Sequence, residues 1–120
     1  MTGASLSQLK DEKYVSLASF RRDGRRVETP VWFAEREGRL YVMTPPDSGK
    51  VKRIRRDPQV EVAPCTAGGR VTGKYMPARA RFLPSEQAAE AKLWIGQRYW
   101  LARVPLLWRR STTVLEISPR

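Results

Sequence analysis

The feature that most constrains the fold of this chain is a succession of short β-rich segments, each closed by a turn signal. Residues 13–20, 27–35 and 39–44 are rich in β-branched and aromatic side chains. The pairs Asp23-Gly24 and Glu37-Gly38 stand between them, and such pairs are typical of tight hairpin turns. The first third of the sequence therefore predicts a meander of three antiparallel strands.

The rest of the chain continues in the same manner, with helical segments inserted twice. Pro45-Pro46 ends the third strand, and Asp47 or Ser48 can cap a helix that Asp57-Pro58 stops. Val51 and Ile54 give that helix a narrow apolar stripe. The further elements predicted are a strand at 59–65, a turn at 67–69, a long strand at 70–83 with a bulge or edge position at Pro77, a helix from Ser85 through 86–100 bent near Gly96 and Pro105, and a strand at 112–118.

The predicted fold is mainly β (α+β), in the order β-β-β-α-β-β-α-β. Six short antiparallel strands and two helices are typical of a small split or closed barrel. A length of 120 residues fits one domain. We assign residues 13–120 to this domain and residues 1–12 to an N-terminal arm or short helix, with Leu6 and Leu9 facing inward.

Composition narrows the chemistry further. The formal net charge of +11 predicts an anionic partner, which can be a nucleic acid, a membrane surface or a polyanionic small molecule. Histidine is absent, which excludes Ser-His-Asp and Cys-His catalysis and most zinc sites. No carboxylate pair stands out, so we predict neither a catalytic residue nor a metal site. Any difficult chemistry would then fall to a cofactor.

Cysteine usage and hydropathy bear on the compartment. Cys65 is the single cysteine, so no internal disulfide can form, and the reducing cytoplasm is the expected location. We expect Cys65 to be a buried structural thiol rather than a nucleophile. No apolar run approaches the roughly 18 residues that a membrane span needs.

The stretch "TPPDSGKVKRIRRDP", residues 44–58, is the first candidate site. Five of the seven residues from Lys50 to Arg56 are basic, and Ser48, Gly49 and Lys50 stand where the N-terminus of the predicted helix attracts anions. The glycine spacing of a Walker loop is missing. From the residues alone, a phosphate site and a solvated helix face remain open.

Two further stretches are candidates. In "ETPVW", residues 28–32, Pro30 removes a backbone donor beside Trp32, which suggests a platform for a flat ring; the alternative is a core tryptophan guarded by an edge proline. In residues 92–110, three tryptophans alternate with arginines. These could contact a membrane or stack on bases, but a core or dimer contact is the favoured interpretation.

Taken together in order, these segments resemble a known family. "TPVWF" after the Asp-Gly hairpin and "T…SGKVKRIRRDP…V…APC" are similar to the pyridoxamine-phosphate-oxidase-like split barrels (the PPOX-class FMN-binding split barrels). Within them, the chain most resembles the branch that uses the deazaflavin coenzyme F420. The resemblance runs from about Lys13 to Leu83, with a weaker echo in "TTVLEIS". It implies a homodimer with the cofactor in a groove at the subunit interface.

The resemblance also implies a set of cofactor-binding residues. Lys50 corresponds to the lysine that holds the cofactor phosphate, and Thr44, Ser48 and Gly49 line the same pocket. Arg53 corresponds to a residue that could grip the polyglutamate tail. The strand that flanks the tricyclic ring corresponds to Thr29, Pro30, Val31 and Trp32. The chain departs from the family in Ala18-Ser19-Phe20, where relatives commonly show Thr-Thr, and in its Trp-rich helix.

The expected function is that of an F420-dependent oxidoreductase acting on an unknown small, unsaturated or aromatic substrate. The alternatives are an FMN-binding flavoprotein, a basic nucleic-acid-binding protein without catalysis, and a split barrel that stores a cofactor without turnover.

Overall fold

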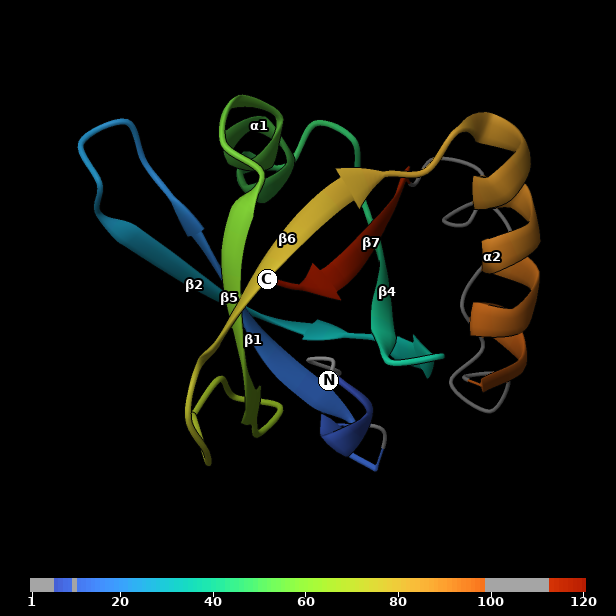
Figure 1. The fold of residues 1–120 in the computed structure, drawn as a ribbon, viewed down its shortest axis with the longest axis horizontal. Helices are drawn as coiled ribbons and strands as arrows, with labels where there is room; N and C mark the ends of the chain where they lie inside the picture. Colours follow the sequence, from blue (N-terminus) through green and yellow to red (C-terminus); the bar gives the residue numbers. More distant parts are fainter. Residues whose placement is uncertain (1–5, 10, 99–112) are drawn as a thin grey trace.

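In the computed structural model, which describes residues 6–9, 11–98 and 113–120, the chain is mainly β with two α-helices (Figure 1). A short 3-10 helix, η1 (Ser7–Leu9), precedes the first strand. The helices are α1 (Gly49–Arg56) and α2 (Ser85–Arg98). The strands are β1 (Tyr14–Phe20), β2 (Arg26–Trp32), β3 (Ala34–Arg36), β4 (Arg39–Thr44), β5 (Gln59–Cys65), β6 (Met76–Phe82) and β7 (Thr113–Pro119).

All seven strands in the described part of the chain form one antiparallel sheet, in the order β2-β1-β5-β6-β7-β4-β3. The two edge strands, β2 and β3, are consecutive in the chain and are separated only by Phe33. The sheet must therefore curl back on itself, and it does so as a half-barrel with α1 over one end and α2 along one side (Figure 1).

The expectation of six strands was wrong because the second strand divides. We predicted one strand over residues 27–35, but β2 pairs with β1 as far as Trp32, whereas Ala34 already pairs with Tyr41 of β4. Phe33, which is 1% exposed, fills the interior at the point of division. An alternating pattern continues across this bend, so the sequence did not reveal it.

The predicted strand at 70–83 is also shorter than expected. Only Met76–Phe82 is a strand, and the preceding residues touch β5 through one bridge between Cys65 and Val71. The predicted edge position of Pro77 was wrong, because β6 lies between β5 and β7. The β7 ladder begins at Ala78, so the missing N–H of Pro77 falls at the start of the strand, where proline is tolerated.

The predicted turns at Asp23-Gly24 and Glu37-Gly38 and the predicted ends of the first helix are confirmed. Glu37 and Gly38 both have positive φ, as a two-residue hairpin turn requires. The first hairpin has a three-residue loop, 22–24, in which Gly24 has a φ of 88°. Helix α1 has Ser48 as its N-cap and Asp57 as its C-cap, and Val51 and Ile54 are its buried residues. The predicted bend at Pro105 and residues Trp100 and Trp108 lie outside the described residues.

Two apolar clusters hold these elements. The larger fills the inside of the curl and includes Leu6 and Leu9 of the N-terminal segment. The smaller lies where α2 packs on β4 and β7, and Trp94 and Tyr41 pack against it. The ring of Trp94 meets that of Tyr41 edge-on at 4.7 Å between centroids, so a core contact is confirmed for this member of the Trp-rich stretch.

Candidate functional site

A pocket of about 250 Å³ opens between β2 and the start of α1. At this place β2 and β4 are not hydrogen-bonded to each other. The edge strand β2 pairs only with β1, and β4 pairs with β7 and β3. The residues that line the pocket are Tyr14, Pro30, Val31, Trp32, Met43, Thr44, Pro45, Lys50 and Ala67. Five of the nine residues predicted for the site, Pro30, Val31, Trp32, Thr44 and Lys50, are among them.

One wall of the pocket is flat and apolar. The side chain of Trp32 is 39% exposed, so the alternative of a core tryptophan was wrong. Tyr14 lies directly across the β1–β2 ladder from Trp32, with 6.2 Å between the ring centroids. Pro30 is exposed on the same face of β2. Two aromatic rings and a proline on the outer face of one hairpin form a surface suited to a planar apolar group.

The opposite end of the pocket is polar and cationic. The Lys50 ammonium donates a hydrogen bond to Thr44 Oγ1 at 3.1 Å, and Thr44 Oγ1 lies 3.3 Å from Ser48 Oγ. Thr44 is buried. Ser48 makes no side-chain capping bond to α1, because its hydroxyl faces Thr44 instead. Burial, and then the nearby charge of Arg53, lower the pKa of Lys50.

The other four predicted residues do not line this pocket. Gly49 and Ser48 begin α1 beside it, and Thr29 lies on β2 opposite Leu17. Arg53 turns away from the pocket, because its Nε donates to Ser19 Oγ of β1 at 2.7 Å. A Cβ on Gly49 would lie 3.0 Å from Arg53 Nη1, so the absent side chain leaves room for the guanidinium.

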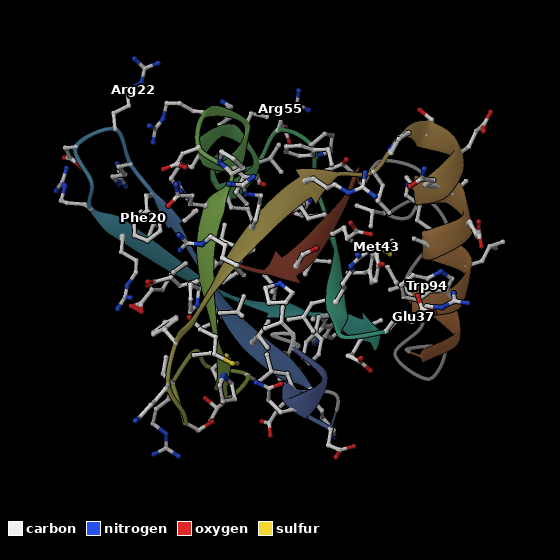
Figure 2. All side chains as sticks on the ribbon, viewed as in Figure 1. Phe20, Arg22, Glu37, Met43, Arg55 and Trp94 are labelled. Atoms are coloured by element: carbon white, nitrogen blue, oxygen red, sulfur yellow. The ribbon has the colours of Figure 1, made fainter. Side chains whose placement is uncertain are left out.

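Three residues of the lining, Tyr14, Met43 and Ala67, were not predicted, and Pro45 lay within the candidate stretch 44–58 without being singled out. Tyr14 pairs with Trp32 because the hairpin loop has three residues, 22–24; a two-residue turn at Asp23-Gly24 would have placed Tyr14 opposite Phe33, so the turn signal alone did not find it. Met43, which Figure 2 labels, lies on β4, and Ala67 lies in the turn that follows β5. Only the tertiary fold brings these two side chains to the pocket.

The segment that carries Ala67 is fastened next to the pocket by Tyr75. The Tyr75 hydroxyl lies 2.7 Å from Ser16 Oγ and donates to Glu28 at 2.5 Å. The Arg26 guanidinium lies over the Tyr75 ring, 4.3 Å from its centroid. A Cβ on Gly69 would lie 3.6 Å from Pro30 Cγ, so the 66–75 segment contacts the apolar wall directly.

Acid–base and metal chemistry find little support in the described residues. No Asp, Glu or His lines the pocket. Within residues 6–9, 11–98 and 113–120, no three His, Cys, Asp or Glu side chains are grouped as a metal site. Cys65 is buried, and burial together with the charge of Glu12 raises the pKa of its thiol, as expected for a structural cysteine. In the same described part, no helix has the length and hydrophobicity of a membrane span.

A family model described as pyridoxamine 5'-phosphate oxidase matches residues 1–120. The search of curated protein sequences found no match.

Several solved structures share the fold at low sequence identity. A structure described as an F420 reductase is similar with a TM-score of 0.67 and 20% identity, covering 100% of this chain and 96% of its own. An FAD-binding protein of Mesorhizobium loti is similar with a TM-score of 0.68 and 16% sequence identity. The match covers 100% of this chain and 91% of that protein. A heme storage protein of Vibrio cholerae is similar with a TM-score of 0.70 and 14% sequence identity. The match covers 95% of this chain and 87% of that protein.

Proposed function

Because this chain belongs to the pyridoxamine 5'-phosphate oxidase family, we propose that it is an oxidoreductase that binds the deazaflavin coenzyme F420. It transfers a hydride between this coenzyme and a small unsaturated or aromatic substrate. The observation that carries the proposal is the pocket itself, in which the flat wall of Pro30 and Trp32 faces the cationic end formed by Thr44 and Lys50.

The residues of the pocket fit the two chemical parts of such a coenzyme. The tricyclic ring would lie against Pro30, Val31 and Trp32. The phosphate would bind at Lys50, with Ser48 and Thr44 as hydroxyl partners. The site has an apolar half and a charged half at opposite ends, as the ring and the phosphate of one molecule require.

The protein's own contribution is position and electrostatics. Bound deazaflavin supplies the hydride chemistry, so the pocket needs no acid or base of its own. Lys50 is a partly desolvated cation next to Arg53, which its lowered pKa reflects. A phosphate at Lys50 would offset both the lost hydration and the repulsion, and it would therefore raise that pKa.

The size of the pocket supports a homodimer. About 250 Å³ lies below the roughly 300–1,000 Å³ that ligand pockets usually enclose. We infer that a second copy of the chain closes the open side, so that the coenzyme binds at the subunit interface.

FMN is the second candidate for the same pocket. The family match and the structural likeness to an FAD-binding protein favour it. A flat apolar wall and a phosphate-binding lysine serve either ring system. A purified protein that is yellow and carries a flavin absorption spectrum would identify FMN as the cofactor.

The test is a titration of the purified protein with oxidised and reduced F420, followed by absorbance and fluorescence. Wild type should bind at micromolar concentration. Lys50→Ala should weaken binding about 10- to 100-fold, as expected for the loss of a hydrogen bond to a charged group worth roughly 1.5–3 kcal/mol.

Lys74→Ala is the matched control, because Lys74 is an exposed lysine outside the pocket, and it should bind like wild type. The absence of micromolar binding by wild type, or equal affinity in Lys50→Ala, would contradict the proposal. Binding without any hydride transfer to a panel of unsaturated and aromatic acceptors would point to cofactor storage.

A further inference from the structure

A second and larger pocket, of about 490 Å³, lies between the β1–β2 hairpin and α1. Its lining residues are Arg21, Arg22, Asp23, Arg25, Lys52, Arg53 and Arg56. It shares no lining residue with the pocket at Lys50. We propose that this basic pocket binds a compact polyphosphate group, independently of the pocket at Lys50.

The charge of the lining is strongly unbalanced. Of the seven described residues that line the pocket, six are cationic, and Asp23 is the single carboxylate among them. Asp23 is already engaged, since it accepts from the Arg25 backbone N–H at 3.0 Å and from Arg25 Nε at 2.8 Å. The remaining cations of the pocket have no carboxylate in its lining. A multiply charged anion would supply the missing charge.

Two of the guanidinium groups are held in place by neutral acceptors. Arg53 Nε donates to Ser19 Oγ, and Arg56 donates to the backbone carbonyl of Phe20. Both acceptors belong to β1, so the sheet orients the arginines without neutralising them. Each guanidinium carries five N–H donors, which is more than these bonds use. The pocket therefore presents donors that are oriented before a ligand arrives.

The cations also repel one another. Burial, and then the charge of Arg21, lower the pKa of Arg53. The repulsion destabilises the folded chain slightly, and a bound anion would remove it. A ligand of this pocket should therefore raise the thermal stability of the protein.

The lining also indicates which anion fits. Arginine forks match phosphate oxygens in pairs. Among the described residues, no aromatic or apolar side chain lines the pocket, so it offers no aromatic ring on which a base could stack. Binding of a single-stranded nucleic acid normally uses such stacking along an extended groove. A pocket of ligand size lined by charged side chains, most of them cationic, favours a short chain of phosphates, whether free or attached to a nucleoside that projects into solvent.

The experiment is calorimetric titration of the full chain with sodium tripolyphosphate, without added metal, in low and moderate salt. Wild type should bind one tripolyphosphate per chain, with an affinity that falls as salt rises. The test variant is Arg21→Gln/Arg22→Gln, since both residues are exposed on the hairpin, and Figure 2 shows Arg22 at its tip. It should bind at least 10-fold more weakly.

The controls separate a built pocket from diffuse surface charge. Arg70→Gln/Arg79→Gln removes the same charge from exposed positions outside both pockets and should bind like wild type. Arg56→Gln tests the α1 side of the pocket and should lose affinity. Equal losses in the control and test variants, or several weakly bound anions per chain, would overturn the proposal.

Three further results complete the test. Lys50→Ala should leave tripolyphosphate affinity unchanged; a loss as large as that of the hairpin variant would move the anion to the first pocket and overturn the proposal.

ATP that binds as tightly as tripolyphosphate would identify a nucleotide as the source of the phosphates, and ATP that binds more weakly would identify a free polyphosphate. Displacement of tripolyphosphate by random single-stranded DNA at equal phosphate concentration would overturn the compact ligand. None of these measurements uses F420, so each proposal can fail alone.

Discussion

Glu116 is the buried charge at the centre of a small polar cluster on β7. Its carboxylate accepts from Arg81 Nε at 2.6 Å and from the Tyr41 hydroxyl at 2.9 Å, and Arg39 lies 3.8 Å away. Burial alone would raise the pKa of Glu116, but the hydrogen bonds from Arg81 and Tyr41 outweigh it, and the pKa is lowered. The ionised form is therefore favoured in the folded state.

A pH dependence of stability follows from this cluster. Since the folded-state pKa lies below the unfolded value, the stabilisation is present above about pH 4.5 and is lost as the pH falls through the folded-state pKa. Glu116→Gln should lower the free energy of unfolding at pH 7 by about 1–3 kcal/mol. The gap between wild type and variant should narrow towards pH 3 in urea denaturation.

Glu90→Gln on α2 is the matched control for this prediction. Glu90 is exposed, so its replacement should change the unfolding free energy little at either pH. A gap between wild type and Glu116→Gln that stays constant from pH 7 to pH 3 would show that the charge of Glu116 is not what stabilises the cluster.

At the scale of elements, the Tyr75 side chain anchors the irregular 66–75 segment to the β1–β2 hairpin, in addition to the backbone bonds that tie the segment to β5. Tyr75 reaches across the outer face of the hairpin to Ser16 and Glu28. Ser16 is 1% exposed and would lose a partner if the hydroxyl were removed. Because Ala67 and Gly69 lie against the pocket wall, a looser segment would also loosen the pocket.

Tyr75→Phe tests this connection, since it keeps the ring under Arg26 and removes only the hydroxyl. We expect a loss of about 1 kcal/mol in unfolding free energy. Relative to wild type, hydrogen exchange should become faster for the amides of 66–75 and should change less for those of β5. Lys74→Ala, an exposed neighbour in the same segment, should leave exchange unchanged. Unaltered exchange in Tyr75→Phe would mean that the segment is held by its backbone.

The elements divide clearly into those that local sequence predicts and those that it does not. Asp23-Gly24 and Pro45-Pro46 act within a few residues of themselves, so the hairpin and the start of α1 were predicted. Phe33 divides a strand because its two flanks pair with different partners, and no local pattern encodes that choice. The composition of residues 70–75 predicts a strand, but in the structure Gly73 packs closely against Pro64. A Cβ at position 73 would lie 2.7 Å from Pro64 Cγ, so only glycine fits there.

The same division applies to the candidate site. Lys50, Thr44 and Trp32 were predicted through a resemblance that spans consecutive motifs, and these three line one pocket. Arg53 was predicted with them but lines the neighbouring basic pocket instead. The direction of the Arg53 side chain is set by its hydrogen-bond acceptor, Ser19 of β1. Only the tertiary packing of α1 on the sheet brings that acceptor within reach.

At the scale of the whole molecule, the proposed dimer makes a prediction about mass and ligand affinity together. Sedimentation should show two copies at micromolar protein, and F420 affinity should fall when the protein is diluted below its dimer dissociation constant. This follows because each subunit alone offers an open pocket of about 250 Å³. A monomer that binds F420 with undiminished affinity would contradict an interface site.

The position of β7 has a consequence for biosynthesis. This strand lies between β6 and β4 in the interior of the sheet, although it follows the other six described strands in the chain. Until it leaves the ribosome, β4 and β6 each lack a neighbour and present unpaired backbone. The nascent chain can form the β1–β2 hairpin early, but the curled sheet closes only when the last strand arrives. Closure of the curled sheet therefore has to wait until β7 has been synthesised.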